Sequence, residues 1–207
     1  MKELLERYPM LKCCAEDIDL IADLIIRSYE HGGKLLICGN GGSSADSDHI
    51  AGELMKGFMK KRHLSEEKKQ KMRLRYPSIE EDTLDGLQMA LPAIPLSSFG
   101  ALCSAFSNDE DPSLVYAQGV MALGAERDVL LAISTSGNSK NVIEAARVAK
   151  SLGMTVLGLS GQTGGILRDV ADACVCVPER ETYKIQELHL PVYHYVCAKI
   201  EEHFFDT

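Results

Sequence analysis

A histidine and a carboxylate four positions apart, His49 and Glu53, are the first residues whose types and spacing could do chemistry. Residues 44–61 are predicted to form a helix, and a spacing of four places both side chains on one helix face. An imidazole and a carboxylate on one face can bind a divalent metal together, or one of them can act as a base. An ordinary hydrogen bond between the two side chains is the alternative interpretation.

Two polar turns, residues 39–44 (GNGGSS) and 134–139 (STSGNS), could bind phosphate. Each follows a predicted strand and precedes a predicted helix, so free N–H groups and the positive end of the helix dipole face one place. The second turn adds the hydroxyls of Ser134, Thr135, Ser136 and Ser139, enough to surround the terminal oxygens of a phosphate monoester. Helix capping, the alternative, needs one such residue per helix. We therefore predict phosphate binding.

A dinucleotide is the competing ligand for the first turn. Gly39 and Gly41 match the first two glycines of a GxGxxG motif, but Ser44 takes the third place. Basic residues at 60–62 stand where an acidic partner for the ribose is expected. We therefore reject NAD.

The elements that must position these residues alternate along the chain. Short apolar runs predict strands at 34–38, 93–97, 128–134, 154–160 and 174–177. Helical spacing predicts helices at 15–31, 44–61, 66–75, 100–106, 112–125, 139–151, 163–170 and 182–205. This order predicts an α/β fold: a single doubly wound domain over 1–207, with a mostly parallel five-stranded sheet flanked by helices. Ligands of such sheets bind beyond the carboxyl ends of the strands, which both turns follow.

Composition narrows the classes of partner. A net charge of −8 argues against generic binding to nucleic acid, whose affinity comes largely from phosphate neutralisation. No apolar run approaches the roughly 18–20 residues that cross a bilayer, and the N-terminus lacks a signal-peptide core, so we expect a cytoplasmic protein that does not bind membranes. The odd number of cysteines, seven, favours small buried hydrophobes over a disulfide framework. Cys174 and Cys176 alternate as on one strand face, which we favour over a metal site.

Three motifs in chain order resemble the phosphoheptose isomerase branch of the SIS (sugar isomerase) family: GNGGSSAD at 39–46, STSGNS at 134–139 and IQELHLPVYH at 185–194. The resemblance covers most of the chain except about 62–90. It implies the SIS fold and an aldose–ketose isomerisation, typically of sedoheptulose 7-phosphate to D-glycero-D-manno-heptose 7-phosphate. It also implies a homo-oligomer, expected to be a homotetramer, with active sites at subunit contacts.

The resemblance further implies one zinc per site, held by His49, Glu53, Gln186 and His194. The substrate contacts that it implies are Asn40, Gly41, Gly42, Glu53, Asn108, Asp109, Ser134, Thr135, Ser136, Ser139 and Gln186. Isomerisation through an enediol moves a proton between adjacent carbons, for which a carboxylate is a natural base and an imidazole a natural acid–base partner. We assign Glu53 as the base and His194 as its partner. A non-catalytic SIS-domain module, binding a phosphosugar or a protein such as a replication initiator, is the alternative; the presence of all four residues favours the enzyme.

Four features depart from the family pattern. Gly57 stands where the family often carries an arginine, and Lys56 or Lys60 could supply the missing positive charge. An acidic stretch with a proline follows Asn108 and Asp109. Residues 62–88 form a charged insertion, either a surface helix or a lid. Pro191 should kink or interrupt the last helix. On one straight helix Gln186 and His194 would lie about 12 Å apart, too far for one zinc. Either Gln186 precedes the helix or the two ligands come from different subunits, and we expect the second.

Overall fold

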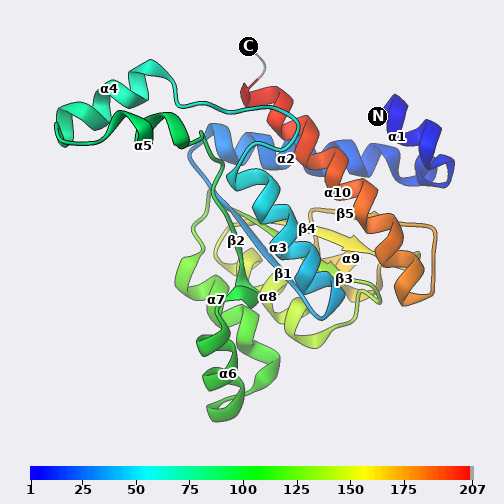
Figure 1. The fold of residues 1–207 in the computed structure, drawn as a ribbon. Coiled ribbons are helices and arrows are strands. Elements are labelled where there is room, and N and C mark those ends of the chain that lie inside the picture. The colour runs from blue at the N-terminus through cyan, green and yellow to red at the C-terminus, as the bar shows by residue number, and fades with distance from the viewer. Residues whose placement is uncertain (206–207) are drawn as a thin grey trace.

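The computed structural model describes residues 1–205 as a parallel sheet with helices on both faces (Figure 1). The strand order is β2-β1-β3-β4-β5, and all four neighbouring pairs are parallel. The strands are β1 (Leu35–Gly39), β2 (Ala93–Pro95), β3 (Val129–Ser134), β4 (Thr155–Ser160) and β5 (Ala173–Cys176). The predicted α/β class and its five strands are confirmed.

Alternation of side chains along the strands divides the interior into two cores. Leu35 and Ile37 of β1 belong to one core, whereas Leu36 and Cys38 belong to the other. This period of two is what a strand buried on both faces requires.

The helices are α1 (Lys2–Arg7), α2 (Ala15–Glu30), α3 (Gly42–Met55), α4 (Glu66–Arg75), α5 (Glu81–Gly86), α6 (Gly100–Asp109), α7 (Val115–Leu123), α8 (Lys140–Ser151), α9 (Gly165–Val170) and α10 (Thr182–Phe205).

Helices α2, α3 and α10 cover the first core, and α7, α8 and α9 cover the second. The second polar turn ends β3 and leads into α8, and the first ends β1 and leads into α3. Because β1 and β3 are parallel neighbours, both turns emerge at the same edge of the sheet. Within residues 1–205, no helix is long and apolar enough to cross a membrane.

The predicted end of one helix and the predicted interruption of another were wrong. Helix α3 ends at Met55 rather than at 61, because the buried Arg62 guanidinium donates to the carbonyls of Leu54 (2.7 Å) and Glu53 (3.0 Å) and so caps it. Pro191 does not interrupt α10, which runs unbroken from Thr182 to Phe205 with Pro191 buried inside it. The proline removes one amide donor, while packing along the helix holds both of its ends.

Residues 62–88 form an arm that projects from the end of α3 away from the sheet (Figure 1). Its two helices are α4, which was predicted, and α5, which was not. Exposed ion pairs join them, including Lys69 with Asp85 (2.5 Å) and Arg73 with Glu81. The ends of the arm meet at its base, where His63 pairs with Gln88 and the Met89 N–H donates to the Arg62 carbonyl (2.7 Å).

Candidate active site

Three of the predicted site residues come together between α3 and α10. His49 Nε2 lies 3.2 Å from Glu53 Oε1 and 3.5 Å from His194 Nε2. His49 and Glu53 are one helical turn apart on α3, as their spacing predicted, and His194 approaches them from α10. The cluster therefore forms within one chain.

A tyrosine fixes the orientation of His49. The Tyr193 hydroxyl donates to Asp46 Oδ1 (3.2 Å) and lies 3.1 Å from His49 Nδ1. Since the hydroxyl proton is directed to Asp46, its oxygen can accept the N–H of His49 Nδ1, which leaves the Nε2 lone pair facing Glu53 and His194. Burial raises the pKa of Asp46, although the Tyr193 hydroxyl opposes the shift.

Glu53 and His194 have different electrostatic surroundings. Lys56 Nζ contacts Glu53 Oε2 at 2.8 Å and the Gly57 carbonyl at 3.2 Å. Burial lowers the pKa of His194 and His49 lowers it further, although Glu53 opposes the shift. The lowered pKa favours a neutral imidazole, which can bind a metal or accept a proton.

The donor set of this cluster fits zinc. Two ligands held about 2.0–2.1 Å from a tetrahedral zinc lie about 3.3 Å apart. The separations from His49 to Glu53 and to His194, 3.2 and 3.5 Å, match that edge length. As they stand, however, no three His, Cys, Asp or Glu side chains in residues 1–205 form a ready metal site. Glu53 Oε1 faces His49, while Lys56 contacts the other carboxylate oxygen, Oε2.

Gln186 lies apart from this cluster. It is on the same unbroken helix as His194, eight residues earlier, which is about 12 Å along the axis. Its side chain packs on Gly42 at the start of α3, where a Cβ would stand 2.5 Å from Gln186 Nε2. Gln186 therefore faces the first polar turn of its own chain.

Three hydroxyls of the second turn take part in hydrogen bonds within the turn, and its N-cap residue does not cap α8 with its side chain. Ser139 stands at the N-cap of α8, yet its Oγ contacts Ser134 Oγ (3.0 Å) and caps no helix N–H. Gly137 has a φ of 66°, which only glycine adopts readily. Thr135 is half-buried and Ser136 is exposed, and Ser136 Oγ accepts the Asn138 N–H at 3.1 Å.

Asparagine side chains join the two turns. Asn40 and Asn141 exchange two amide hydrogen bonds, of 2.8 and 2.9 Å. The Tyr116 hydroxyl donates to the Gly39 carbonyl (2.7 Å) and lies 3.2 Å from Asn40 Oδ1. Asn108 and Asp109, predicted substrate contacts, end α6, where they bond to each other (2.9 Å). The loop that follows reaches the second turn through Asp111 and Lys140, 3.6 Å apart.

Comparisons with known proteins identify the family of this chain. A family model described as the SIS domain matches residues 1–75 and 88–161. A phosphoheptose isomerase from Roseiflexus is 39% identical over 186 residues, 90% of this chain and 81% of the relative. One from Synechocystis is 34% identical over 99% of this chain and 91% of the relative. The phosphoheptose isomerase structure from Neisseria gonorrhoeae has a TM-score of 0.76 at 31% identity, covering 97% of this chain and 94% of that one.

The chain belongs to the SIS-domain family of phosphoheptose isomerases. The resemblance predicted from its three motifs is confirmed, and so is the class of enzyme, an isomerase. The SIS-domain match omits residues 76–87, the turn after α4 and all of α5, so this part of the arm lies outside the family pattern.

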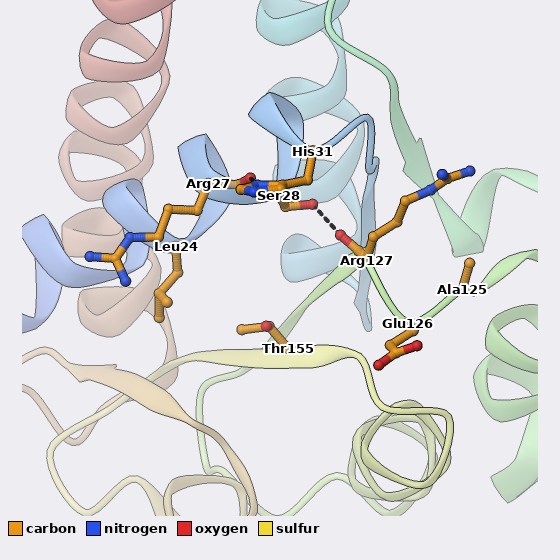
Figure 2. A pocket seen from close by; sticks show the side chains of 8 residues that line it. All are labelled: Leu24, Arg27, Ser28, His31, Ala125, Glu126, Arg127 and Thr155. Atoms are coloured by element: carbon orange, nitrogen blue, oxygen red, sulfur yellow. Dashed lines mark hydrogen bonds between the residues drawn. The ribbon is translucent and has the colours of Figure 1, made fainter.

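The structure has one hollow near the candidate active site of this isomerase and another far from it. The first, of about 740 Å³, lies beside His194. It is lined by α1, by α10 with Pro191, and by the segment after α3 with Phe58. Another of about 600 Å³ lies where β4 begins, the opposite edge of the sheet from the turns (Figure 2). In Figure 2 the guanidinium groups of Arg27 and Arg127 point away from each other, so they do not converge on a ligand.

Sequence reasoning missed the residues that support the site. Tyr193 and Asp46 orient His49, while Asn141 and Tyr116 hold Asn40. Tyr193 and Asp46 lie inside two of the motifs quoted for the SIS family, which was a usable signal. Asn141 and Tyr116 lie 101 and 76 residues from Asn40 and carried none.

Proposed function

We propose that the protein interconverts a ketose and an aldose phosphate, sedoheptulose 7-phosphate and D-glycero-D-manno-heptose 7-phosphate. The observation that carries the proposal is the cluster of His49 and Glu53, on the helix that begins at the first polar turn, with His194 of α10. From Gly42 to His49, α3 advances about 10 Å. A sugar chain of several carbons can span that distance with its phosphate at one end and its carbonyl at the other.

In the proposed reaction Glu53 removes the proton from the carbon next to the carbonyl and returns it to the adjacent carbon. His194, whose pKa is lowered by burial, moves the proton between the two sugar oxygens. Lys56, at 2.8 Å from Glu53, supplies a positive charge near the position where relatives often carry arginine. The substrate contacts that we propose are Asn40, Gly41, Gly42, Glu53, Asn108, Asp109, Ser134, Thr135, Ser136, Ser139 and Gln186.

The direct test is a panel of ketose and aldose phosphates incubated with the purified protein, with interconversion followed by NMR. We expect conversion of sedoheptulose 7-phosphate, and slower or no conversion of the pentose and hexose phosphates. Binding of these sugars without conversion of any of them would favour the non-catalytic SIS-domain module instead.

We propose that zinc binds to His49, Glu53 and His194, with a glutamine as fourth ligand. When bound, the zinc would stabilise the negative oxygens of the enediolate. Protein purified without chelator is expected to contain about one zinc per site by elemental analysis. His49→Ala should lose most of it, whereas His31→Ala, a change at the opposite edge of the sheet, should keep it. Equal zinc in both variants would contradict the assignment.

The fourth ligand leads to a proposal about assembly. Gln186 cannot join His194 at one metal within a single chain, because both are on one unbroken helix. We propose a homotetramer in which Gln186 of a neighbouring chain completes each site, and the hollow beside His194 gives that chain room to approach.

Mixing inactive variants tests the shared site. Glu53→Gln and Gln186→Ala chains, unfolded and refolded together, should recover activity, because some mixed sites then receive an intact Glu53 and an intact Gln186. The matched control mixes Glu53→Gln with His194→Ala, which should recover nothing, because those residues act within one chain. Recovery in the control, or a fully active monomer by light scattering, would overturn the proposed arrangement.

A further inference from the structure

A pair of thiols lies on the edge strand β5, outside the candidate active site. Cys174 and Cys176 are two residues apart, so their side chains leave the same face of the sheet, and their Sγ atoms are 3.9 Å apart. Both are half-buried, and β5 pairs with β4 alone among the described strands. Neighbouring glycines leave room for the sulfurs: a Cβ at Gly158 would stand 2.5 Å from Cys174 Sγ, and one at Gly164 2.8 Å from Cys176 Sγ.

The surroundings make Cys176 the more reactive of the two. The Cys174 thiol and, more weakly, the Arg168 guanidinium lower the pKa of Cys176 to about 7, although burial opposes them. Contact with Cys176, together with burial, raises the pKa of Cys174. Near neutral pH about half of Cys176 is therefore thiolate, the nucleophilic form, beside a protonated thiol. A thiolate next to a second, resolving thiol is the arrangement found in redox sensors.

We propose that Cys174 and Cys176 are a redox-sensitive dithiol that a hydroperoxide converts to an intramolecular disulfide, and that this closure weakens phosphosugar binding. The Cys176 thiolate attacks the hydroperoxide, the O–O bond breaks, and the leaving oxygen takes a proton and departs as alcohol or water. The sulfenic acid left on Cys176 is then attacked by the Cys174 sulfur, and its hydroxyl departs as water with the Cys174 proton. The two thiols lose two electrons and the hydroperoxide gains them.

The edge position of β5 permits the closure and makes it reversible. Residues two apart on an extended strand have Cα atoms about 6.6 Å apart, close to the upper limit of about 6.8 Å for a disulfide. The sulfurs must also approach from 3.9 Å to bonding distance, so the strand has to bend. A four-residue strand with one hydrogen-bonded neighbour can do so. A strained disulfide is readily reduced, which suits a reversible modification.

Gly164 connects Cys176 of the dithiol to the second polar turn. Gly164, which borders Cys176 Sγ, packs so closely on Gly137 that a Cβ there would stand 1.8 Å from the Gly164 carbonyl oxygen. The Leu167 N–H donates to the Gly137 carbonyl (3.0 Å), and the Ile166 N–H donates to Asn138 Oδ1 (3.1 Å). Movement of Cys176 thus displaces the segment that supports the turn. This effect on binding rests on the proposed function, whereas the disulfide does not.

The test treats the full-length reduced protein with hydrogen peroxide, alkylates the remaining thiols and measures peptide masses. Cys174 and Cys176 lie between Arg168 and Arg180, so one tryptic peptide carries both. We expect that peptide to escape alkylation with a mass two hydrogen atoms below its reduced form, and to revert with a dithiol reductant. Cys176→Ser should abolish the change, whereas Cys103→Ser should not. If both cysteines stay alkylatable while exposed Cys13 is oxidised, or if they form only sulfinic acid, the dithiol proposal is wrong.

Calorimetry on the same samples tests the coupling. Oxidation should weaken sedoheptulose 7-phosphate binding by roughly tenfold, the loss of about one hydrogen bond to a charged phosphate, and reduction should restore it. Ser136→Ala should weaken binding by a similar factor without any oxidant. A disulfide with unchanged affinity would overturn the coupling alone. Absence of binding even in reduced protein, with the disulfide formed, would count against the proposed function and leave the dithiol standing.

Discussion

Glu53→Gln is expected to lower the turnover of the phosphosugar by about 10²–10⁴-fold while substrate binding stays within a few-fold of wild type. The amide keeps the shape of the side chain, including a contact with His49, but it cannot accept the carbon-bound proton. Turnover is measured by NMR conversion and binding by calorimetry, at equal zinc content. The two readouts separate loss of the base from loss of the site.

A matched control for this variant lies on α8. Glu144 pairs with Arg147 at 2.8 Å and a spacing of three, as Glu53 pairs with Lys56, but it lies outside the cluster. Glu144→Gln should leave turnover unchanged. A Glu53→Gln enzyme within a few-fold of the wild-type rate would remove Glu53 from the role of base.

Removing one partner of the buried ion pair between Arg62 and Glu201 is expected to cost about 3–5 kcal/mol of unfolding free energy. Arg62 Nε donates to Glu201 Oε1 at 2.7 Å, and the two residues are 2% and 1% exposed. The carboxylate also accepts the N–H groups of Phe58 (2.8 Å) and Met59 (2.7 Å). Glu201→Gln leaves the guanidinium charged in an interior without its counter-ion, which accounts for the size of the effect.

Denaturant unfolding at fixed protein concentration measures the loss, and a double-mutant cycle isolates the pair. Arg62→Met together with Glu201→Gln should cost less than the sum of the single changes, because no unpaired charge remains. Glu202→Gln, the exposed neighbour on α10, should stay within about 0.5 kcal/mol of wild type. Strict additivity would show that the pair contributes no coupling.

The same pair makes a pH dependence with a defined sign. Burial alone would raise the pKa of Glu201, but the Phe58 N–H and the Arg62 guanidinium lower it below its ordinary value. A carboxyl with a lowered pKa in the folded state contributes stability above its unfolded pKa and loses it as pH falls through the folded one. The unfolding free energy of the wild type should therefore fall in acid. That of Glu201→Gln should fall less, because this variant lacks the carboxylate at every pH.

Sequence patterns predicted those features of the fold and the site that depend on residues close together in the chain. The four-residue step from His49 to Glu53 set their shared face, and the hydroxyl-rich run at 134–139 marked a turn beyond a strand. The end of α3 could not be read this way, because the group that caps it, Arg62, is held by Glu201, 139 residues away. The expected interruption at Pro191 was wrong because helix propensity describes an isolated helix. In the fold, packing against α2 and α3 holds α10 along its length.

The position of Gln186 shows a different limit of prediction from sequence. Its distance from His194 followed from helix geometry alone, and it ruled out one metal site within one chain. Which neighbour its side chain meets depends on the crossing of α3 and α10, since Gly42 leaves space that any other residue would fill. A single sequence carries no signal for such a crossing.

The closed base of the arm bears on how this chain could have changed in evolution. Because His63 pairs with Gln88, the two ends of the insertion are already neighbours, so residues between them can be gained or lost at a loop-closure cost that grows only slowly with length. Arg62, which caps the turn carrying Glu53, lies outside that interval, and the SIS-domain match resumes at residue 88. New sequence could therefore accumulate there, and acquire surface properties of its own, while the residues that do the chemistry kept their places.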